Sequence, residues 1–477
     1  MSRVRIVATI GPATNNADSL RALAAAGMNV ARLNGSHSDL EWHRATIALL
    51  RKALPDTPIL LDIPGRKIRT VGLRHEPSFA AGDTVTLTTE PDHDGSKKVP
   101  VNYDRLHEDL KAGNTILADD GTLRFTVTAV RGRDIVCRAE TPGTLRSRKG
   151  INVPFVKLNT ALVTERDHKM VGFARETGVD FIGISFVESA AHVNAIRELA
   201  GKDGPRIVSK VENQGGLDHM EEILAATDAA MIDRGDLSVE TNLESLTLFQ
   251  KRIIDAARAA GKPVIVATEM LHTMIENDFP TKAEVSDITN AVLDGTSALM
   301  LSGETAVGRH PVSAVTLMRQ VANAAERYLQ VRLDDADAIA RRSVPRAMED
   351  AIALICRSLP ITKIVAVTRS GYAARSVAAR QVRQPIIAVS NDAQAARSFN
   401  ILPGVTGAHV DIPFSRTSTD HIVVCLEALW RRGLLAGDDL VLVTAVGYPK
   451  SGNRMNLIQT HHVADLATTL KWKARRS

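Results

Sequence analysis

Short runs of apolar, often β-branched residues alternate through most of the chain with longer stretches in which apolar residues recur every three or four positions. The first pattern predicts a buried strand, and the second predicts a helix with one buried face. Eight strands are predicted in this way between the N-terminus and residue 302. They are Val4–Ile10, Asn29–Leu33, Pro58–Ile63, Phe181–Val187, Ile207–Glu212, Ala229–Arg234, Pro263–Thr268 and Ala298–Ser302.

A helix is predicted after each of these strands, although the third strand is separated from its helix by a different kind of segment. The helices are Asn16–Ala26, Leu40–Leu54, Glu165–Thr177, Ala190–Leu199, Leu217–Ala226, Leu243–Ala260, Lys282–Leu293 and Val312–Tyr328. Eight βα units that close on themselves form a TIM barrel. A flat, doubly wound sheet is the competing fold, but its Gly-rich dinucleotide fingerprint does not occur in this sequence.

The segment that interrupts the third unit runs from about Arg69 to Pro154. Its short alternating stretches are separated by turn signals such as Asp119-Asp-Gly, which predicts an all-β insert. After about Leu333, an acidic connection at Asp334–Ala340 leads into a second set of alternating helices and strands. These are Ala347–Ser358, Lys363–Val367, Ala373–Arg380, Pro385–Val389, Thr419–Arg431 and Leu440–Thr444.

The predicted fold class is therefore α/β, with a TIM (β/α)8 barrel, an all-β lid domain inserted after the third strand and a C-terminal α/β domain. We expect the barrel to comprise residues 1–68 and 157–332, the lid residues 69–156 and the C-terminal domain residues 333–477. The length of 477 residues fits several domains, because single cores rarely grow beyond about 250–300 residues.

The composition is that of an ordinary globular protein and argues against several classes of function. The net charge is +5, but only 4% of residues are aromatic and no dense Lys/Arg block occurs, which argues against nucleic-acid binding. No apolar run approaches the roughly 20 residues of a membrane span, and no signal peptide is expected before the first strand. The three cysteines, Cys137, Cys356 and Cys425, are far apart and favour a reducing, cytoplasmic compartment.

Charged residues lie at the ends of the fifth and sixth predicted strands. Lys210 and Glu212 are two positions apart, so a strand directs both side chains to one face. Asp236 follows the next strand in a Gly-Asp turn. Two carboxylates at neighbouring strand ends suit Mg²⁺, which takes one or two protein carboxylates together with water and substrate phosphate. Lys210 beside them can stabilise a phosphoryl group in transit, and a structural Lys210–Glu212 salt bridge is the alternative.

Further polar residues are expected at the same end of the barrel, where the active sites of TIM barrels lie. Six of the predicted strand ends contribute them, and this convergence favours an active site over a merely polar rim. The residues are Arg32, Asn34, Ser36, Asp62, Lys210, Glu212, Gly235, Asp236, Thr268, Glu269, Ser302, Glu304 and Thr305.

Motifs along nearly the whole chain resemble those of the pyruvate kinase family. They are Ile6–Ala13, Gly27–Asn34, Ser147–Asn152, Ser209–Asn213, Arg234–Leu237, Ala291–Gly295 and Leu301–Thr305, in this order. Each motif alone is weak, but together they are highly specific. The resemblance implies Mg²⁺- or Mn²⁺-dependent phosphoryl transfer from phosphoenolpyruvate to ADP, giving pyruvate and ATP, in a homotetramer.

The resemblance also implies catalytic roles. Lys210 would stabilise the transferring phosphoryl group, and Arg32 would contact it. Thr268 would lie near the carbon at which the enolate is protonated, with Ser302 as its partner.

Substrate and metal contacts are implied for the neighbouring residues. Glu212 and Asp236 would hold the divalent cation, and the backbone at Gly235 and Asp236 would receive the substrate carboxylate at the start of a short helix. Nucleotide contacts are implied for Asn34, His37, Arg69 and Lys149, with the β insert acting as a lid that excludes water.

A monovalent-cation site is implied at Asn34, Ser36 and Asp62. Potassium-dependent members usually carry Glu at the position of Lys67 and Thr at the position of Ile63. Since a tethered ammonium can supply the charge that K⁺ would bring, we expect activity here without potassium.

Several neighbours of these residues depart from the family pattern, namely Gly35, Ser38, Arg66, Asp233, Ser238 and Glu269. Asp233 and Glu269 add negative charge near a site expected to bind anions. Two alternatives therefore stay open: a paralogue that uses another enol phosphate, and a sensor that keeps ligand binding without turnover.

In the C-terminal domain, Thr368, Arg369, Ser370 and Gly371 resemble the loop with which this family grips phosphorylated effectors. An ordinary glycine turn between a strand and a helix is the alternative interpretation of this motif.

Overall fold

The computed structural model describes residues 3–65, 67–119, 121–156, 158–159, 161–332, 344–415, 418–446 and 455–472. Arg66 and the predicted connection at 334–340 lie outside these ranges. None of the described helices is long and apolar enough to cross a bilayer.

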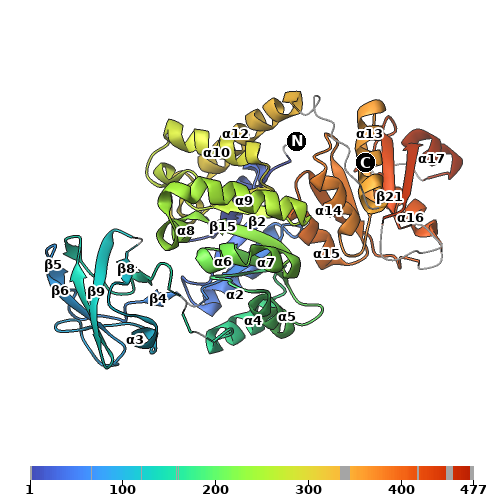
Figure 1. Ribbon diagram of the computed structural model, residues 1–477. Helices are drawn as coiled ribbons and strands as arrows, with labels where there is room; N and C mark the ends of the chain where they lie inside the picture. The colour runs from blue at the N-terminus through green and yellow to red at the C-terminus, as the bar shows by residue number, and fades with distance from the viewer. Residues whose placement is uncertain are drawn as a thin grey trace.

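Eight parallel strands close into a barrel at the centre of the molecule (Figure 1). They are β1 Arg5–Thr9, β2 Val30–Asn34, β3 Ile59–Ile63, β13 Phe181–Ile184, β14 Arg206–Val211, β15 Ala229–Asp233, β16 Val264–Ala267 and β17 Ala298–Leu301. The order around the barrel is β1-β17-β16-β15-β14-β13-β3-β2, so the last strand pairs with the first. The predicted TIM barrel is confirmed, and all eight strands lie at the predicted places with ends that differ by up to three residues.

Most barrel helices also match the prediction. They are α1 Ala17–Ala26, α2 Leu40–Ala53, α4 Glu165–Thr177, α5 Ala190–Ala200, α9 Leu246–Ala259, α10 Lys282–Asp294 and α12 Pro311–Arg332. The single helix predicted at Leu217–Ala226 is wrong: two helices, α6 Gln214–Asp218 and α7 Met220–Ala226, meet at His219. The side chain of Asn213 accepts a hydrogen bond from Gly216 N, and this cap begins the first helix earlier than its apolar pattern indicates.

Short helical segments follow the sixth, seventh and eighth barrel strands before the main helices begin. They are α8 Arg234–Glu240, η1 Leu243–Ser245, η2 His272–Ile275 and α11 Gly303–Ala306. Three of them begin within five residues of a strand end, so they shape the rim where the predicted site residues lie.

The insert after β3 is built from short strands around its own apolar core. The strands are β4 Ile68–Arg69, β5 Ser78–Phe79, β6 Thr84–Thr88, β7 Val99–Pro100, β8 Thr115–Ala118, β9 Leu123–Arg131, β10 Asp134–Ala139, β11 Gly143–Thr144 and β12 Gly150–Asn152. Seven form a sheet in the order β4-β12-β8-β9-β10-β6-β7, and β11 pairs with β5. The prediction of a β-rich insert is confirmed, with a short helix, α3 Leu106–Asp109, added to it.

The C-terminal region forms a five-stranded sheet in the order β20-β19-β18-β21-β22, with only β22 antiparallel. Its elements are α13 Val344–Ser358, β18 Lys363–Val367, α14 Tyr372–Ala379, β19 Ile386–Ser390, α15 Ala393–Ser398, η4 Phe399–Ile401, β20 Val405–His409, α16 Asp420–Arg431, β21 Leu440–Ala445, β22 Leu457–His462 and α17 Val463–Thr469. The sequence did not predict α15, β20, β22 or α17. Both missed strands lie at edges of the sheet, where polar residues replace the apolar run that marks a central strand.

The insert and the C-terminal domain lie on opposite sides of the barrel (Figure 1). The insert approaches the C-terminal ends of the strands, where Asn152 donates a hydrogen bond to Glu240. The C-terminal domain packs against the opposite ends: Arg5, at the start of β1, donates to the Leu402 carbonyl at 2.9 Å, and Arg397 pairs with Asp180 just before β13. The barrel therefore separates two interfaces that contact different ends of its strands.

Candidate active site

Lys210, near the end of β14, places its ammonium among three carboxylates. Its Nζ lies 2.7 Å from Glu212 Oε1, 3.1 Å from Asp233 Oδ2 and 3.4 Å from Asp62 Oδ2. It also donates a hydrogen bond to Ser185 Oγ at 3.2 Å. Burial opposes the charge on Lys210, but the three carboxylates outweigh it and hold the pKa of the ammonium well above its ordinary value. Lys210 is thus a buried cation that stays charged at neutral pH.

Arg32 stands beside this cluster on β2. Its Nη2 and Nε lie 2.6 Å and 3.1 Å from Asp62 Oδ2, and its Nη1 donates to Thr9 Oγ1 at 3.1 Å. Asp62 therefore joins two cations, Arg32 and Lys210, through one oxygen. The predicted convergence of both basic residues at one end of the barrel is observed in these contacts.

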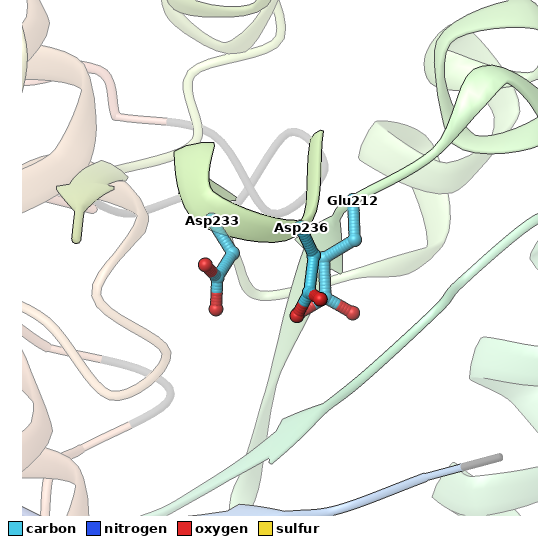
Figure 2. A group of neighbouring side chains, drawn as sticks. All are labelled: Glu212, Asp233 and Asp236. Atoms are coloured by element: carbon cyan, nitrogen blue, oxygen red, sulfur yellow. The ribbon is translucent and has the colours of Figure 1, made fainter. Parts of the chain in front are cut away.

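Three carboxylates form a compact group at the ends of β14 and β15 (Figure 2). One oxygen each from Glu212, Asp233 and Asp236 lies within 4.8 Å of the others. Burial raises the pKa of Asp236, and the nearby charge of Asp233 raises it further. Carboxylate oxygens are the ligands that Mg²⁺ prefers, and a divalent cation removes the repulsion among crowded carboxylates. The donor set therefore fits a hard divalent cation.

Glu212 is held rigidly within this group. Its side chain has no exposed surface, and its Oε2 accepts the N–H of Phe186 at 2.6 Å. Burial raises the pKa of Glu212, while the neighbouring Lys210 opposes that rise. The proposed structural salt bridge between Lys210 and Glu212 is present as a contact, but it is one of several around the same ammonium.

Lys67, on the segment that leads from β3 into the insert, pairs with Asp236 at 2.5 Å. Nearby, Asn152 Nδ2 in β12 donates to Glu240 Oε1 at 2.6 Å. Burial raises the pKa of Glu240 to about 7, although the hydrogen bond from Asn152 works in the opposite direction. These contacts join the insert and the segment leading into it to both ends of α8.

Thr268 follows β16 with a left-handed backbone, φ 68°. Its Oγ1 accepts the N–H of Gly235 at 2.9 Å, so one of the two backbone donors predicted for a substrate carboxylate already has a partner. Arg234 holds the turn in place by donating to the Thr268 carbonyl at 2.7 Å while pairing with Asp287. The buried guanidinium of Arg234 thus stabilises the left-handed conformation of Thr268 through this hydrogen bond.

Ser302 lies directly after β17 as the first residue of the turn into α11. Its N–H donates to Glu304 Oε2 at 2.7 Å, and Glu304 Oε1 accepts the N–H of Leu271 at 3.0 Å. The Ser302 hydroxyl is buried and has no hydrogen-bond partner among the described residues. Glu304 therefore ties the rim segments after β16 and β17 together.

The residues predicted to contact nucleotide lie in two separate places. Asn34 ends β2, and its Oδ1 accepts the N–H of Ser36 at 3.1 Å, while His37 lies in the same turn. Because β2 ends at Asn34, Ser36 lies in the turn after the strand and not on the strand itself. Arg69 in β4 and Lys149 beside β12 lie in the insert, where Lys149 pairs with Asp119 at 2.7 Å.

The residues that depart from the expected motifs differ in how closely they approach the Lys210 cluster. Asp233 is buried and contacts Lys210, whereas Glu269 is exposed. A Cβ on Gly35 would lie 2.9 Å from the backbone oxygen of Asp62 and 2.7 Å from Met170 Cε, so a larger residue there requires rearrangement. Ser38 has φ 61°, a left-handed conformation that favours glycine.

The Thr368–Gly371 segment forms a tight turn between β18 and α14. Thr368 Oγ1 accepts the N–H of Gly371 at 3.0 Å, and Gly371 has φ 79°. Arg369 and Ser370 are exposed at its tip. The segment therefore forms the ordinary glycine turn between a strand and a helix. The side chains of Arg369 and Ser370 are also accessible to a ligand.

Sequence reasoning missed two polar residues that touch the central cations, Thr9 at the end of β1 and Ser185 just after β13. The predicted site residues were identified as polar residues at the C-terminal ends of barrel strands. The same criterion identifies Thr9 and Ser185 when it is applied to the first and fourth strands. From the sequence, Asp233 was expected only to add negative charge, because its position on a strand does not reveal that its carboxylate contacts Lys210.

Comparisons with known proteins agree with this architecture. The chain matches the family model described as pyruvate kinase, barrel domain, over residues 1–315, and the model described as pyruvate kinase, alpha/beta domain, over residues 346–461. It is 37% identical to a pyruvate kinase of Bacillus licheniformis over 490 aligned positions, covering 100% of this chain and 83% of that protein. It is 37% identical to one of Clostridium perfringens, with 94% and 97% covered, and 36% identical to one of Mycobacterium tuberculosis, with 97% and 99% covered.

Proposed function

The chain belongs to the pyruvate kinase family, and from this premise we propose that it transfers a phosphoryl group from phosphoenolpyruvate to ADP, giving pyruvate and ATP. The observation that carries the proposal is the cluster around Lys210, in which a buried, charged ammonium and Arg32 stand beside a group of carboxylates. Phosphoryl transfer depends on such positioning and charge stabilisation more than on covalent catalysis by the protein.

Glu212 and Asp236 are the proposed ligands of the divalent cation, Mg²⁺ or Mn²⁺, and Asp233 supplies a third carboxylate within reach. The bound cation would neutralise charge on the substrate phosphate and carboxylate. The chain's own part is to hold these oxygens in place, which the hydrogen bond from Phe186 N to Glu212 does directly.

Lys210 and Arg32 are proposed to bind the phosphoryl group as it moves between donor and acceptor. In the structure both cations are neutralised by Asp62 and its neighbours, so the anionic substrate would take over part of that role. A buried ammonium acts strongly on such charge because little water screens it.

Thr268 is proposed to lie near the enolate carbon, with Ser302 as its partner in protonation. The free hydroxyl of Ser302 and the fixed, left-handed backbone of Thr268 support this arrangement. Gly235 and Asp236 are the proposed backbone donors to the substrate carboxylate, and Thr268 Oγ1 would release the Gly235 N–H as substrate enters.

For the nucleotide, we propose contacts from Asn34 and His37 at the rim and from Arg69 and Lys149 on the insert. The insert would close over the site as a lid and exclude water. Lys149 is partly exposed and pairs with Asp119, which is also in the insert, so it can exchange this partner for a phosphate.

The monovalent-cation position at Asn34, Ser36 and Asp62 is proposed to work without potassium. Lys67 supports this, because its ammonium already lies within the carboxylate group, in contact with Asp236. The proposed charge therefore comes from the chain itself.

Further proposals concern the domain boundaries, the oligomeric state, the effector and the location of the protein. We keep the domain division at 1–68 with 157–332, 69–156 and 333–477, a homotetramer, and a phosphorylated effector at Thr368, Arg369, Ser370 and Gly371. A cytoplasmic location is supported by three buried cysteines without disulfides among the described residues. No role for nucleic acid or membrane is proposed.

The decisive experiment is an assay with phosphoenolpyruvate, ADP and Mg²⁺, coupled to lactate dehydrogenase. We expect turnover that depends on all three components. Substrate binding by calorimetry without any turnover would favour the sensor, and turnover with a different enol phosphate alone would favour the paralogue. The retention of Lys210, Glu212, Asp236 and Thr268 together favours the enzyme over the sensor, because binding alone does not need them all.

A further inference from the structure

A partly open cavity of about 440 Å³ lies at the end of the barrel opposite the Lys210 cluster. Its walls come from residues that precede β1, β16 and β17, from helix α12 of the barrel, and from α13, α14 and the segment before β20 of the C-terminal domain. Cavities of this volume are typical of sites for small molecules. The cavity belongs to neither domain alone, so an occupant would touch both.

The lining of this cavity is strongly basic. Glu326 is the only carboxylate among the described lining residues, and its oxygens already accept the backbone N–H groups of Arg3 and Val4. Cys356 also lines the cavity, but burial raises the pKa of its thiol to about 11, so it stays neutral. The basic lining residues are Arg3, Arg258, Lys262, Arg357, Arg375, Arg380 and Arg383.

Within this group, Arg380 is balanced by Glu349 and Asp350. Lys262 and Arg375 are not balanced in this way. Burial lowers the pKa of Lys262, and the positive charge of Arg375 lowers it further. Burial likewise lowers the pKa of Arg375, and the positive charge of Arg206 lowers it further. Cations whose charge is opposed by neighbouring cations indicate that negative charge is scarce in this wall.

The one carboxylate that attracts both of these cations, among the described residues, also serves other groups. Asp228 attracts Lys262 and Arg375, but its Oδ2 lies 3.0 Å from Arg197 Nη1 and accepts the N–H of Ile207 at 2.9 Å. A single carboxylate with this many partners cannot neutralise the wall of the cavity.

We propose that this cavity binds a phosphorylated small molecule that bridges the barrel and the C-terminal domain. Guanidinium groups match phosphate oxygens with paired hydrogen bonds, and six of the described lining residues are arginines. Gln384 adds a neutral contact, because its side-chain oxygen is buried and has no hydrogen-bond partner among the described residues. That oxygen can accept a hydroxyl, which fits a phosphorylated sugar or nucleoside better than bare phosphate.

The cavity is distinct from the effector loop proposed above, since Thr368–Gly371 do not line it. Arg375 nevertheless connects the two, because its Nη1 donates to the Ser370 carbonyl at 2.9 Å. Substituting Arg375 would therefore disturb both places, and the test must use other residues.

The test is calorimetric titration of the full-length protein with pyrophosphate at constant ionic strength and without divalent cations. Lys262→Met removes one partly buried charge and keeps most of the alkyl chain. The double variant Arg258→Ala/Arg357→Ala removes two exposed lining charges with little risk to folding. Arg252→Ala removes an exposed arginine of α9 outside the cavity and is the matched control.

We expect pyrophosphate affinity to fall at least about tenfold in Lys262→Met and in the double variant, and to stay unchanged in Arg252→Ala. We also expect the cavity-dependent binding to persist in Lys210→Met and in Thr368→Ala. Equal affinity of wild type and both cavity variants would overturn the proposal.

Two other outcomes would also overturn it. Binding that disappears in Lys210→Met or Thr368→Ala would place the anion at the active site or at the effector loop. Tighter binding of citrate than of pyrophosphate at the cavity would exclude a phosphate ligand. Both results are separate from the coupled assay, so a failure here leaves the proposed catalytic function untouched.

Discussion

At the C-terminal end of the barrel, Lys210 is surrounded by three carboxylates, whereas at the N-terminal end Lys262 shares one carboxylate with three arginines. Both ends belong to the same eight barrel strands. The carboxylates at the ends of β3, β14 and β15 balance the first cation, while arginines from α5 and α14 oppose the charge of the second.

The difference shows two ways in which one barrel can prepare for anions. Around Lys210, the chain supplies its own counter-charges, so substrate and metal enter by replacing contacts that already exist. Around Lys262, the chain leaves the cations without enough counter-charge, so an anion would fill a deficit. We expect substitutions at the two ends to affect different measurements.

The largest effect is expected for Lys210→Met. Removing the main charge that faces the phosphoryl group should raise the barrier by about 3–5 kcal/mol, roughly 10²–10⁴-fold in kcat. The coupled assay measures this directly. The matched control is Lys262→Met, which removes the same charge at the opposite end and should keep kcat near that of the wild type. A Lys210→Met enzyme with unchanged kcat would remove Lys210 from the mechanism.

The next effect concerns the carboxylates around Lys210. Glu212→Gln and Asp236→Asn each remove a charged oxygen ligand, and we expect the Mg²⁺ concentration for half-maximal rate to rise on the order of 100-fold, about 2.7 kcal/mol. Activity is measured against Mg²⁺ concentration for both variants. Glu349→Gln, which removes a carboxylate at the other end, is the control. Unchanged half-saturation in both site variants would show that these carboxylates are only structural.

A smaller effect is expected from potassium. Because Lys67 already contacts Asp236, replacing tetramethylammonium with K⁺ at equal ionic strength should change the initial rate by less than about tenfold, or 1.4 kcal/mol. Lys67→Glu should lower the rate without K⁺, and added K⁺ should restore part of it. Strong activation of the unaltered enzyme by K⁺ would count against a charge supplied by Lys67.

The smallest effect is expected for Glu240, where the insert meets α8. Its pKa is raised to about 7 by burial, so its contribution to stability is present below its ordinary value near 4.5 and is lost as the pH rises through about 7. Since the side chain is partly exposed, we expect a loss of only about 1–2 kcal/mol between pH 5 and pH 8.

The comparison for this prediction is Glu240→Gln, which keeps an acceptor for Asn152 but cannot ionise. Urea unfolding of both proteins at the two pH values measures the difference. Parallel pH dependences of wild type and variant would show that Glu240 does not titrate in this range.

The elements of the barrel were predictable because each strand carries a continuous apolar run and each main helix has one apolar face. Lys210, Glu212 and Asp236 were also predictable as neighbours, since the ends of adjacent parallel strands meet at one rim. Edge strands such as β20 and β22 were not predictable, because polar residues at an edge lack that pattern.

The sequence by itself therefore determined the barrel, the insert and the end of the barrel where the chemistry lies. Only the tertiary structure decided which charges balance one another. Asp233 turns to Lys210 and Lys67 reaches Asp236, although 169 positions separate the last two. The basic cavity likewise has no local signature, because its arginines come from segments between residues 3 and 383. Side-chain direction and domain packing place such groups together, and neither is encoded in the periodicity of any one segment.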